Sequence, residues 1–319
     1  MKYTFISGFA QAIQEYISLR QAMGNQEETF SRRLHSFDSY CAEHFPENTA
    51  LTQEICDGWC ALRDGESLAT LKLRTGILRG FSKYLNSLYR DSYVIPEGYT
   101  GRPKRYHPYI YTDEELSDFF ESADTMPPHK LSPCREYVIP VLFRMLYCCG
   151  LRPQEIPPLE INDVNLENGV IWISDSKRNK DRIVAMSPDL LELCRDFNRH
   201  MDLLIPGRRY FFQCKAGKCC TVGWIQAQFH KCWKQAGKQF SESNHPRVYD
   251  FRHNFATRVI RKWLDERLDV TCMLPYLSSF MGHESLEYTA YYIHLVPEHL
   301  AVSGKAEWET GIEVPSYER

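Results

Sequence analysis

The sequence lacks a run of about 18 uncharged apolar residues, so no segment is expected to span a membrane. It also lacks a signal peptide, because the N-terminal stretch MKYTFISGFAQAIQEY gains polar side chains too early. We therefore expect a cytoplasmic protein. The 319 residues include no internal repeat, and 43% hydrophobic with 25% charged residues is typical of a soluble globular protein. This length predicts two domains.

Cysteine pairs separated by two residues, which structural zinc sites normally use, are missing although the chain has 12 cysteines. The densest group is Cys214, Cys219, Cys220, His230 and Cys232, where zinc binding is the alternative to free thiols. No secretion signal accompanies the cysteines. They are better explained as small apolar side chains in a reducing compartment, so we expect no metal site.

An overall excess of positive charge, which nucleic-acid-binding domains usually have, is absent. The net charge is −3 and the isoelectric point about 6.4, which taken alone argues against DNA binding. Residues 67–90 nevertheless contain no acidic residue and carry the cations Lys72, Arg74, Arg79, Lys83 and Arg90. A solvated helix face is one explanation, but uncompensated cations in an acidic chain favour a surface that faces phosphates.

Apolar residues at helical spacing predict helices in the first part of the chain, over residues 5–23, 27–44, 52–62 and 67–90. We interpret residues 1–93 as a small helical domain that grips DNA. Residues 94–111 are rich in proline and glycine and predict a linker. Its cations Arg102, Lys104 and Arg105 suit either a strap along DNA or a plain exposed tether.

The second domain is predicted to cover residues 112–319, with a short acidic tail from about residue 296. Thr112 and Glu115 form a capping box at its first helix, and the apolar run 137–149 predicts a core helix. Alternation of apolar and polar residues predicts a β-hairpin with strands over 169–174 and 182–186. Further helices are predicted over 188–205, over 221–237 and from Pro246 onward. The predicted fold is mostly α with a small β-sheet (α+β).

Several polar residues of this domain are of the types that bind a phosphodiester and attack its phosphorus. Arg152 follows the core helix with Glu155 three positions later, which is either a structural ion pair or a guanidinium held toward a phosphate. Arg252 and His253 open the long helix, and Tyr292 lies further on. Guanidiniums form bidentate contacts with phosphate, and a phenol can serve as a nucleophile.

The order Gly-Leu-Arg-x-x-Glu at 150–155, Lys177, Arg252–His253, Gly282–His283 and Tyr292 resembles the tyrosine recombinase (phage-integrase-type) family, over residues 110–296. The stretch 274–278 is similar to that of transposon-borne members. The resemblance implies that residues 1–93 are the family's helical core-binding domain. It also implies that neither ATP, a metal nor another cofactor takes part.

The resemblance implies a role for each matching residue. Tyr292 would form a 3′-phosphotyrosyl bond and free a 5′-hydroxyl, while Arg152 and Arg252 would clamp the scissile phosphate. Lys177 would protonate the leaving 5′ oxygen, and His283 would hydrogen-bond the phosphate. These roles agree with the main demand of phosphoryl transfer, which is positioning and positive charge around the phosphate.

Two of these assignments compete with simpler interpretations. A lysine at a hairpin tip, as expected for Lys177, is normally just exposed. Tyr288 and Tyr291 compete with Tyr292, since neighbouring tyrosines at helical spacing are more often core residues than catalysts. The spacing from His283 favours Tyr292.

Tyr249 departs from the family pattern, which has a histidine three residues before the second arginine. A phenol is a poorer base than an imidazole near neutral pH, although it can still hydrogen-bond a phosphate oxygen or the nucleophile. The identity of the general base therefore stays open. Glu155 and His253 are expected to brace the site.

The resemblance implies a site-specific DNA recombinase that serves a mobile element as integrase or transposase. Its partners would be double-stranded DNA, three further copies of the chain in a tetramer on paired sites, and accessory DNA-binding proteins. A type IB topoisomerase-like nicking-closing enzyme shares this chemistry and is one alternative. The other is a catalytically weakened DNA-binding accessory protein, suggested by Tyr249 and the acidic isoelectric point.

Overall fold

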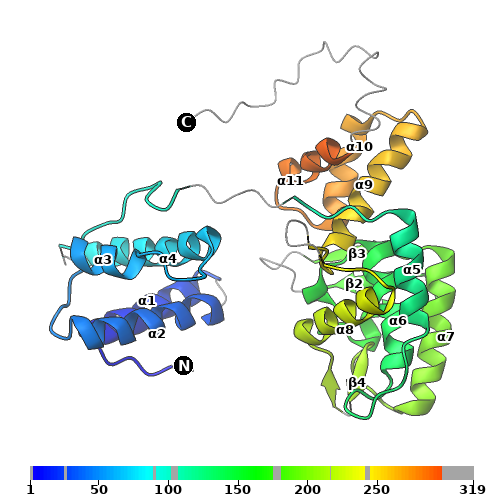
Figure 1. Ribbon diagram of the computed structural model, residues 1–319, viewed down its shortest axis with the longest axis horizontal. Helices are drawn as coiled ribbons and strands as arrows, with labels where there is room; N and C mark the ends of the chain where they lie inside the picture. Colours follow the sequence, from blue (N-terminus) through cyan, green and yellow to red (C-terminus); the bar gives the residue numbers. More distant parts are fainter. Residues whose placement is uncertain are drawn as a thin grey trace. The chain divides into compact units, whose positions relative to one another are not determined.

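The computed structural model describes residues 3–24, 27–88, 91–101, 107–174, 181–215, 217–240 and 245–296. The chain divides into two compact units, Met1–Tyr106 and His107–Arg319, and the boundary falls within the predicted linker (Figure 1). Its fold is mostly helical with a small antiparallel sheet, as the sequence predicted. Within the described ranges, no helix has the length and apolar character needed to cross a bilayer.

The described residues of the first unit form four helices around one apolar core. They are α1 (Ala10–Ala22), α2 (Glu27–His44), α3 (Gln53–Cys60) and α4 (Leu68–Ser87). Each contributes the apolar face that its periodicity predicted, with Ile13, Phe37, Trp59 and Phe81 among the buried side chains. Ser67 caps α4 by accepting a hydrogen bond from the backbone N–H of Thr70.

Arg74 does not belong to the row of phosphate-facing cations that we predicted along α4. Its side chain is buried, pairs through Nε and Nη2 with Glu66 at 3.1 and 2.5 Å, and donates to the carbonyls of Trp59 and Ala61. Glu66 lies just outside the segment that contains no acidic residue, so that segment alone did not reveal the ion pair. The expectation that Arg74 contacts DNA is therefore wrong.

Arg79 also has a structural partner. It donates from Nε to the carbonyl of Ile95 and from Nη2 to that of Pro96, both at 2.7 Å, and so holds the segment after α4 onto the first unit. Lys72 and Lys83 remain exposed on the same helix. The linker cations Arg102, Lys104 and Arg105 lie outside the described residues.

The predicted linker contributes to both cores rather than forming a plain tether. Ile95 is buried in the first unit and Tyr111 in the second. The backbone N–H of Tyr111 donates to Asn254 Oδ1 at 3.0 Å, and its hydroxyl donates to the carbonyl of Arg247 at 2.9 Å. The start of the second unit is thereby attached to the helix that carries Arg252.

The second unit contains most of the helices and both sheets. The helices are α5 (Asp113–Asp124), α6 (Arg135–Cys149), α7 (Pro188–Leu204), α8 (Val222–Gln235), α9 (Asp250–Asp265), α10 (Val270–Met281) and α11 (Leu286–Ala290). Short 3-10 helices cover Pro153–Glu155, Ile161–Asp163 and Tyr291–Leu295. Helix α6 packs against α5, α7 and α9 (Figure 1).

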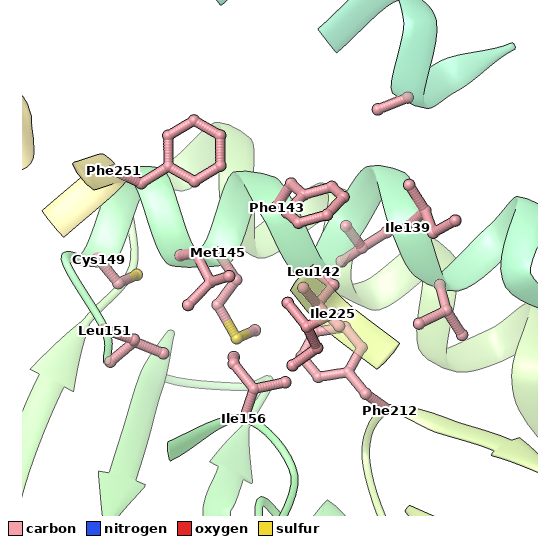
Figure 2. Close-up of a cluster of buried hydrophobic side chains, with 14 of the residues drawn as sticks. Ile139, Leu142, Phe143, Met145, Cys149, Leu151, Ile156, Phe212, Ile225 and Phe251 are labelled. Carbon is pink, nitrogen blue, oxygen red and sulfur yellow. The ribbon is translucent and has the colours of Figure 1, made fainter. Parts of the chain in front are cut away.

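Helix α6 is the centre of the second core, as its apolar sequence predicted. Its buried residues Ile139, Leu142, Phe143 and Met145 face side chains from several other elements, among them Ile156, Phe212, Ile225 and Phe251 (Figure 2). Gly150 ends the helix with φ +58°, and a Cβ there would lie 2.5 Å from the ring of Phe255. The chain can therefore turn sharply toward Arg152 only with glycine at this position.

The sheet is larger than the hairpin that the sequence predicted. Strands β1 (Val164–Asn165), β2 (Val170–Ile173) and β3 (Arg182–Ala185) pair antiparallel in that order, and a second pair joins β4 (Gln213–Lys215) to β5 (Lys218–Cys219). Strand β3 buries Arg182 and Val184 and exposes Ile183. A buried arginine at this place has direct consequences for the site.

Candidate active site

Arg152 is held by contacts with two segments. It follows Gly150 and Leu151 at the entry to the 3-10 helix, where its backbone N–H donates to Glu155 Oε2 at 2.7 Å. Its Nη1 donates to Glu155 Oε1 at 2.8 Å, and its Nη2 donates to the carbonyl of Gly282 at 2.6 Å. The side chain keeps 17% of its surface exposed, so the positioned guanidinium is still accessible from outside.

Arg252 lies deeper, on the first turn of α9. It is 1% exposed, and its Nη1 donates to the carbonyl of Gly150 at 2.6 Å while its Nη2 donates to that of Met281. Burial and the neighbouring charge of Arg152 lower its pKa to about 10, which leaves it protonated at neutral pH. Its Nε is buried and has no hydrogen-bond partner among the described residues.

The two arginines therefore meet at one place, although they are far apart in sequence. Their Nη2 atoms bind the carbonyls of two successive residues, Met281 and Gly282. The repulsion between two guanidiniums is costly where both are largely removed from water, and a nearby anion would relieve it. The two side chains therefore concentrate positive charge at one place.

Arg182 is a third cation of this cluster, and it was not predicted from the sequence. Its Nη1 and Nη2 donate to Glu155 Oε1 and Oε2 at 2.7 and 2.8 Å, and its Nε donates to the carbonyl of Phe280 at 3.0 Å. The available signal was alternation, since Arg182 stands two residues before the inward Val184.

Glu155 is the counter-charge that Arg152 and Arg182 share. Burial alone would raise the pKa of its carboxyl, but the hydrogen bonds and charge of Arg182, together with those of Arg152, lower that pKa overall. The carboxylate is 8% exposed and binds both arginines at once. It therefore fixes the position of Arg152 relative to strand β3.

His283 follows directly after the carbonyls that bind the arginines. Gly282 ends α10 with φ +64°, and the backbone N–H of His283 donates to the carbonyl of Ser278 at 3.0 Å. Its Nδ1 lies 2.7 Å from Thr289 Oγ1. Burial and the charges of Arg252, Arg152 and Arg182 lower its pKa to about 3, so the imidazole is neutral at physiological pH.

Tyr292 brings the phenol into the same cluster. It is 4% exposed on the last 3-10 helix, and its ring lies nearly parallel to that of His283, at 6.0 Å between centroids and 19° between planes. Burial raises the pKa of its hydroxyl, and the charge of Arg252 opposes that shift. Tyr288 is 60% exposed, in contrast to Tyr292.

His253, which we expected to brace the site, directly contacts the phenol of Tyr292. Its Nδ1 lies 3.0 Å from the hydroxyl oxygen of Tyr292. Tyr249, in the place of the family's usual histidine, is half-buried at the N-cap of α9, with its ring centroid 5.2 Å from that of His253. Tyr249 therefore lies beside the imidazole of His253.

Two further expectations concern Lys177 and the cysteine-rich group around Cys220, and the structure describes only some of these residues. Lys177 and the hairpin tip around it lie outside the described residues. Cys220 and Cys232 are buried free thiols, and burial raises the pKa of each to about 12. In the part of the chain that is described, which leaves out the side chain of Cys214, no group of three or more His, Cys, Asp or Glu residues is arranged to hold a metal ion.

Two guanidiniums and a buried phenol, on this largely helical fold, are the features of a tyrosine-type enzyme that breaks and rejoins DNA strands. The model of the phage integrase family matches residues 111–299, more than half of the sequence. The chain therefore belongs to this family, the tyrosine recombinases.

Curated relatives agree with this assignment, and solved structures share the fold. The y4rB protein of Sinorhizobium fredii, named as an integrase/recombinase, is 29% identical over 92% of this chain and 95% of its own length. The tyrosine recombinase XerC of Lactobacillus delbrueckii is 26% identical over 76% of this chain and 78% of its own. Among structures, the XerH site-specific recombinase bound to palindromic difH substrate has a TM-score of 0.64 at 23% identity, covering 93% of this chain and 84% of that one. The Tn1549 transposon integrase in complex with transposon right end DNA has a TM-score of 0.63 at 14% identity, covering 92% and 99%.

Proposed function

We propose that this protein is a site-specific recombinase that cuts and rejoins double-stranded DNA through a 3′-phosphotyrosyl bond at Tyr292. The observation that carries the proposal is the binding of Arg152 and Arg252 to successive carbonyls beside a buried tyrosine. A phosphodiester beside these arginines would receive bidentate contacts from the guanidiniums, and Arg252 Nε is a further donor without a partner in the described structure. Such charge stabilisation is usually the largest contribution to the rate.

The proposed reaction exchanges one phosphate ester for another. The phenolic oxygen of Tyr292 attacks phosphorus, the bond between phosphorus and the 5′ oxygen breaks, and the leaving oxygen takes a proton, for which Lys177 is the candidate. His283 is neutral and hydrogen-bonds a phosphate oxygen. A 5′-hydroxyl from the same or a second duplex then attacks the phosphotyrosine and releases Tyr292. Because the ester bond is conserved, the exchange requires no ATP.

We further propose that the protein moves or integrates a mobile element and acts as a tetramer on paired DNA sites, with accessory DNA-binding proteins as candidate partners. The likeness to an integrase of a transposon and to site-specific recombinases supports this role. Lys72 and Lys83 are exposed cations of α4 and suit contacts with the DNA backbone.

Covalent capture of DNA tests the proposed function. A library of nicked duplexes with a random core, in which cleavage releases a short strand and prevents religation, is incubated with the protein, and denaturation-resistant complexes are sequenced. We expect an adduct that Tyr292→Phe abolishes and Tyr291→Phe retains. Absence of any adduct across the library would contradict the proposal.

The two alternatives predict different products. A nicking-closing enzyme would relax supercoiled plasmids that carry the captured site without joining two of them, whereas a recombinase forms recombinant joints. A weakened accessory protein would bind the site without a covalent adduct. The accessory protein is not favoured, because the arginine pair, His283 and the buried Tyr292 are all present in one cluster. The nicking-closing enzyme is not favoured, because the family match and the similar curated proteins are integrases and recombinases.

A further inference from the structure

The hydroxyl of Tyr292 has a basic nitrogen within hydrogen-bonding distance. His253 Nδ1 lies 3.0 Å from it, and the two rings are 5.6 Å apart between centroids. His253 follows Arg252 directly, so one turn of α9 supplies both a phosphate-facing guanidinium and a contact to the nucleophile. A proton acceptor must lie about this close to the proton that it removes.

A buried carboxylate lies on the other side of the imidazole. Asp250 is 0% exposed, and its Oδ1 is 4.0 Å from His253 Nε2. Its Oδ2 accepts a hydrogen bond from the backbone N–H of Arg247 at 2.8 Å, which fixes the carboxylate in place. At 4.0 Å the attraction is electrostatic rather than a direct hydrogen bond, and it favours a hydrogen on Nε2. Nδ1 is then the acceptor and faces the phenol.

We propose that His253 is the general base of strand cleavage and that Asp250 positions it. In this step Nδ1 takes the phenolic proton as the oxygen of Tyr292 bonds to phosphorus. The same proton returns to that oxygen when a 5′-hydroxyl displaces it. The inference rests on the proposed function and adds the path of one proton, so no further reactant is required. Phenol, imidazole and carboxylate stand in the order in which nucleophile, base and orienting group are normally arranged.

The surroundings of His253 suit this role. Burial and the charges of Arg247 and Arg252 lower its pKa to about 4, so the free enzyme presents an unprotonated imidazole at neutral pH. The buried Asp250 and an incoming phosphate are the anions that would stabilise the imidazolium once the proton arrives. Tyr249 offers only another phenol, which is a weak base at this pH.

Single-turnover cleavage of the captured nicked duplex tests the assignment. We expect His253→Ala and His253→Gln to slow cleavage by about 100-fold or more, which is the usual contribution of a general base. Affinity for the DNA should remain within about threefold of the unchanged protein, since neither change removes a phosphate contact. Imidazole added to the buffer should partly restore the rate of His253→Ala. Asp250→Asn should slow cleavage less, by about tenfold. The asparagine amide oxygen can still accept the hydrogen bond from the backbone N–H of Arg247, so only the negative charge beside His253 is lost.

The control is His294→Ala, which removes an exposed imidazole from the same 3-10 helix that carries Tyr292. It should cleave at the unchanged rate and not respond to imidazole. If His253→Ala does not fold, His253→Gln decides alone, because glutamine keeps a polar contact with the phenol but cannot take up its proton. Cleavage by His253→Gln within about tenfold of the unchanged protein would overturn the assignment. Failure of the unchanged protein to form an adduct would instead overturn the proposed function.

Discussion

Arg182 binds both carboxylate oxygens of Glu155, at 2.7 and 2.8 Å, and both side chains are buried. Because Glu155 also binds Arg152, this pair connects strand β3 to the guanidinium of Arg152. All three guanidinium nitrogens of Arg182 donate to groups of the protein. Arg182 thus helps to hold Arg152, the residue that we propose to contact the phosphate.

Replacing Arg182 should therefore impair both stability and cleavage. Arg182→Gln leaves a buried carboxylate with one fewer partner, and breaking a buried pair from one side usually costs about 3–5 kcal/mol. Denaturant unfolding should show this loss, and cleavage should slow because Arg152 is less well held. Arg209→Gln is the matched control, since Arg209 pairs with Glu160 on the surface and its loss should change stability far less. Equal effects of the two changes would contradict the role of Arg182.

Gly282 should tolerate no side chain. Its φ is +64°, and an added Cβ would lie 3.0 Å from Arg182 Cδ, so Gly282→Ala combines backbone strain with displacement of Arg182. Gly237→Ala shares the strain, with φ +72°, but meets no atom within 4 Å. We expect each change to cost about 1–2 kcal/mol from the backbone alone. Only Gly282→Ala should also abolish most cleavage, and normal cleavage by it would show that the contact is unimportant.

The cations of α4 should separate into two groups when they are removed one at a time. Arg74→Gln breaks a buried ion pair with Glu66 and should destabilise the protein by about 3–5 kcal/mol. Lys72→Gln removes an exposed cation, so stability should hardly change. DNA affinity should instead fall, with the slope of log affinity against log salt smaller by about one. A salt slope unchanged in Lys72→Gln would exclude this residue from the DNA surface.

Stability should fall as the medium becomes mildly acidic, because the folded state holds two half-buried histidines neutral while the unfolded chain protonates them. The folded pKa values of His253 and His283 are lowered to about 4 and about 3, below the unfolded value of about 6.5. The unfolded chain therefore binds more protons between these values, so this contribution to stability is complete above pH 6.5 and is lost as pH falls toward the folded pKa values. His253→Gln should flatten the dependence of the unfolding free energy on pH between about 6.5 and 4. An unchanged slope would show that this imidazole is not held neutral.

The sequence by itself determined the helices and the order of the motifs. Both are local properties: apolar periodicity makes α4 and α6 helical, and Gly150 ends its helix whatever packs around it. The spacing after His283 favoured Tyr292, which is buried in the structure while Tyr288 is exposed. These predictions needed no knowledge of which segments meet.

The tertiary structure alone decided which charges are paired and which are free to act. Arg74 pairs with Glu66, two residues before its own helix begins, Arg182 meets Glu155 from another element, and His253 reaches Tyr292 from α9. A side chain's partner depends on the fold, because guanidinium, carboxylate and imidazole groups interact with whatever lies within about 4 Å, whether it is near or far in sequence. For that reason most residues of the candidate site were predictable from the sequence, whereas Arg182 and the contacts between distant residues were not.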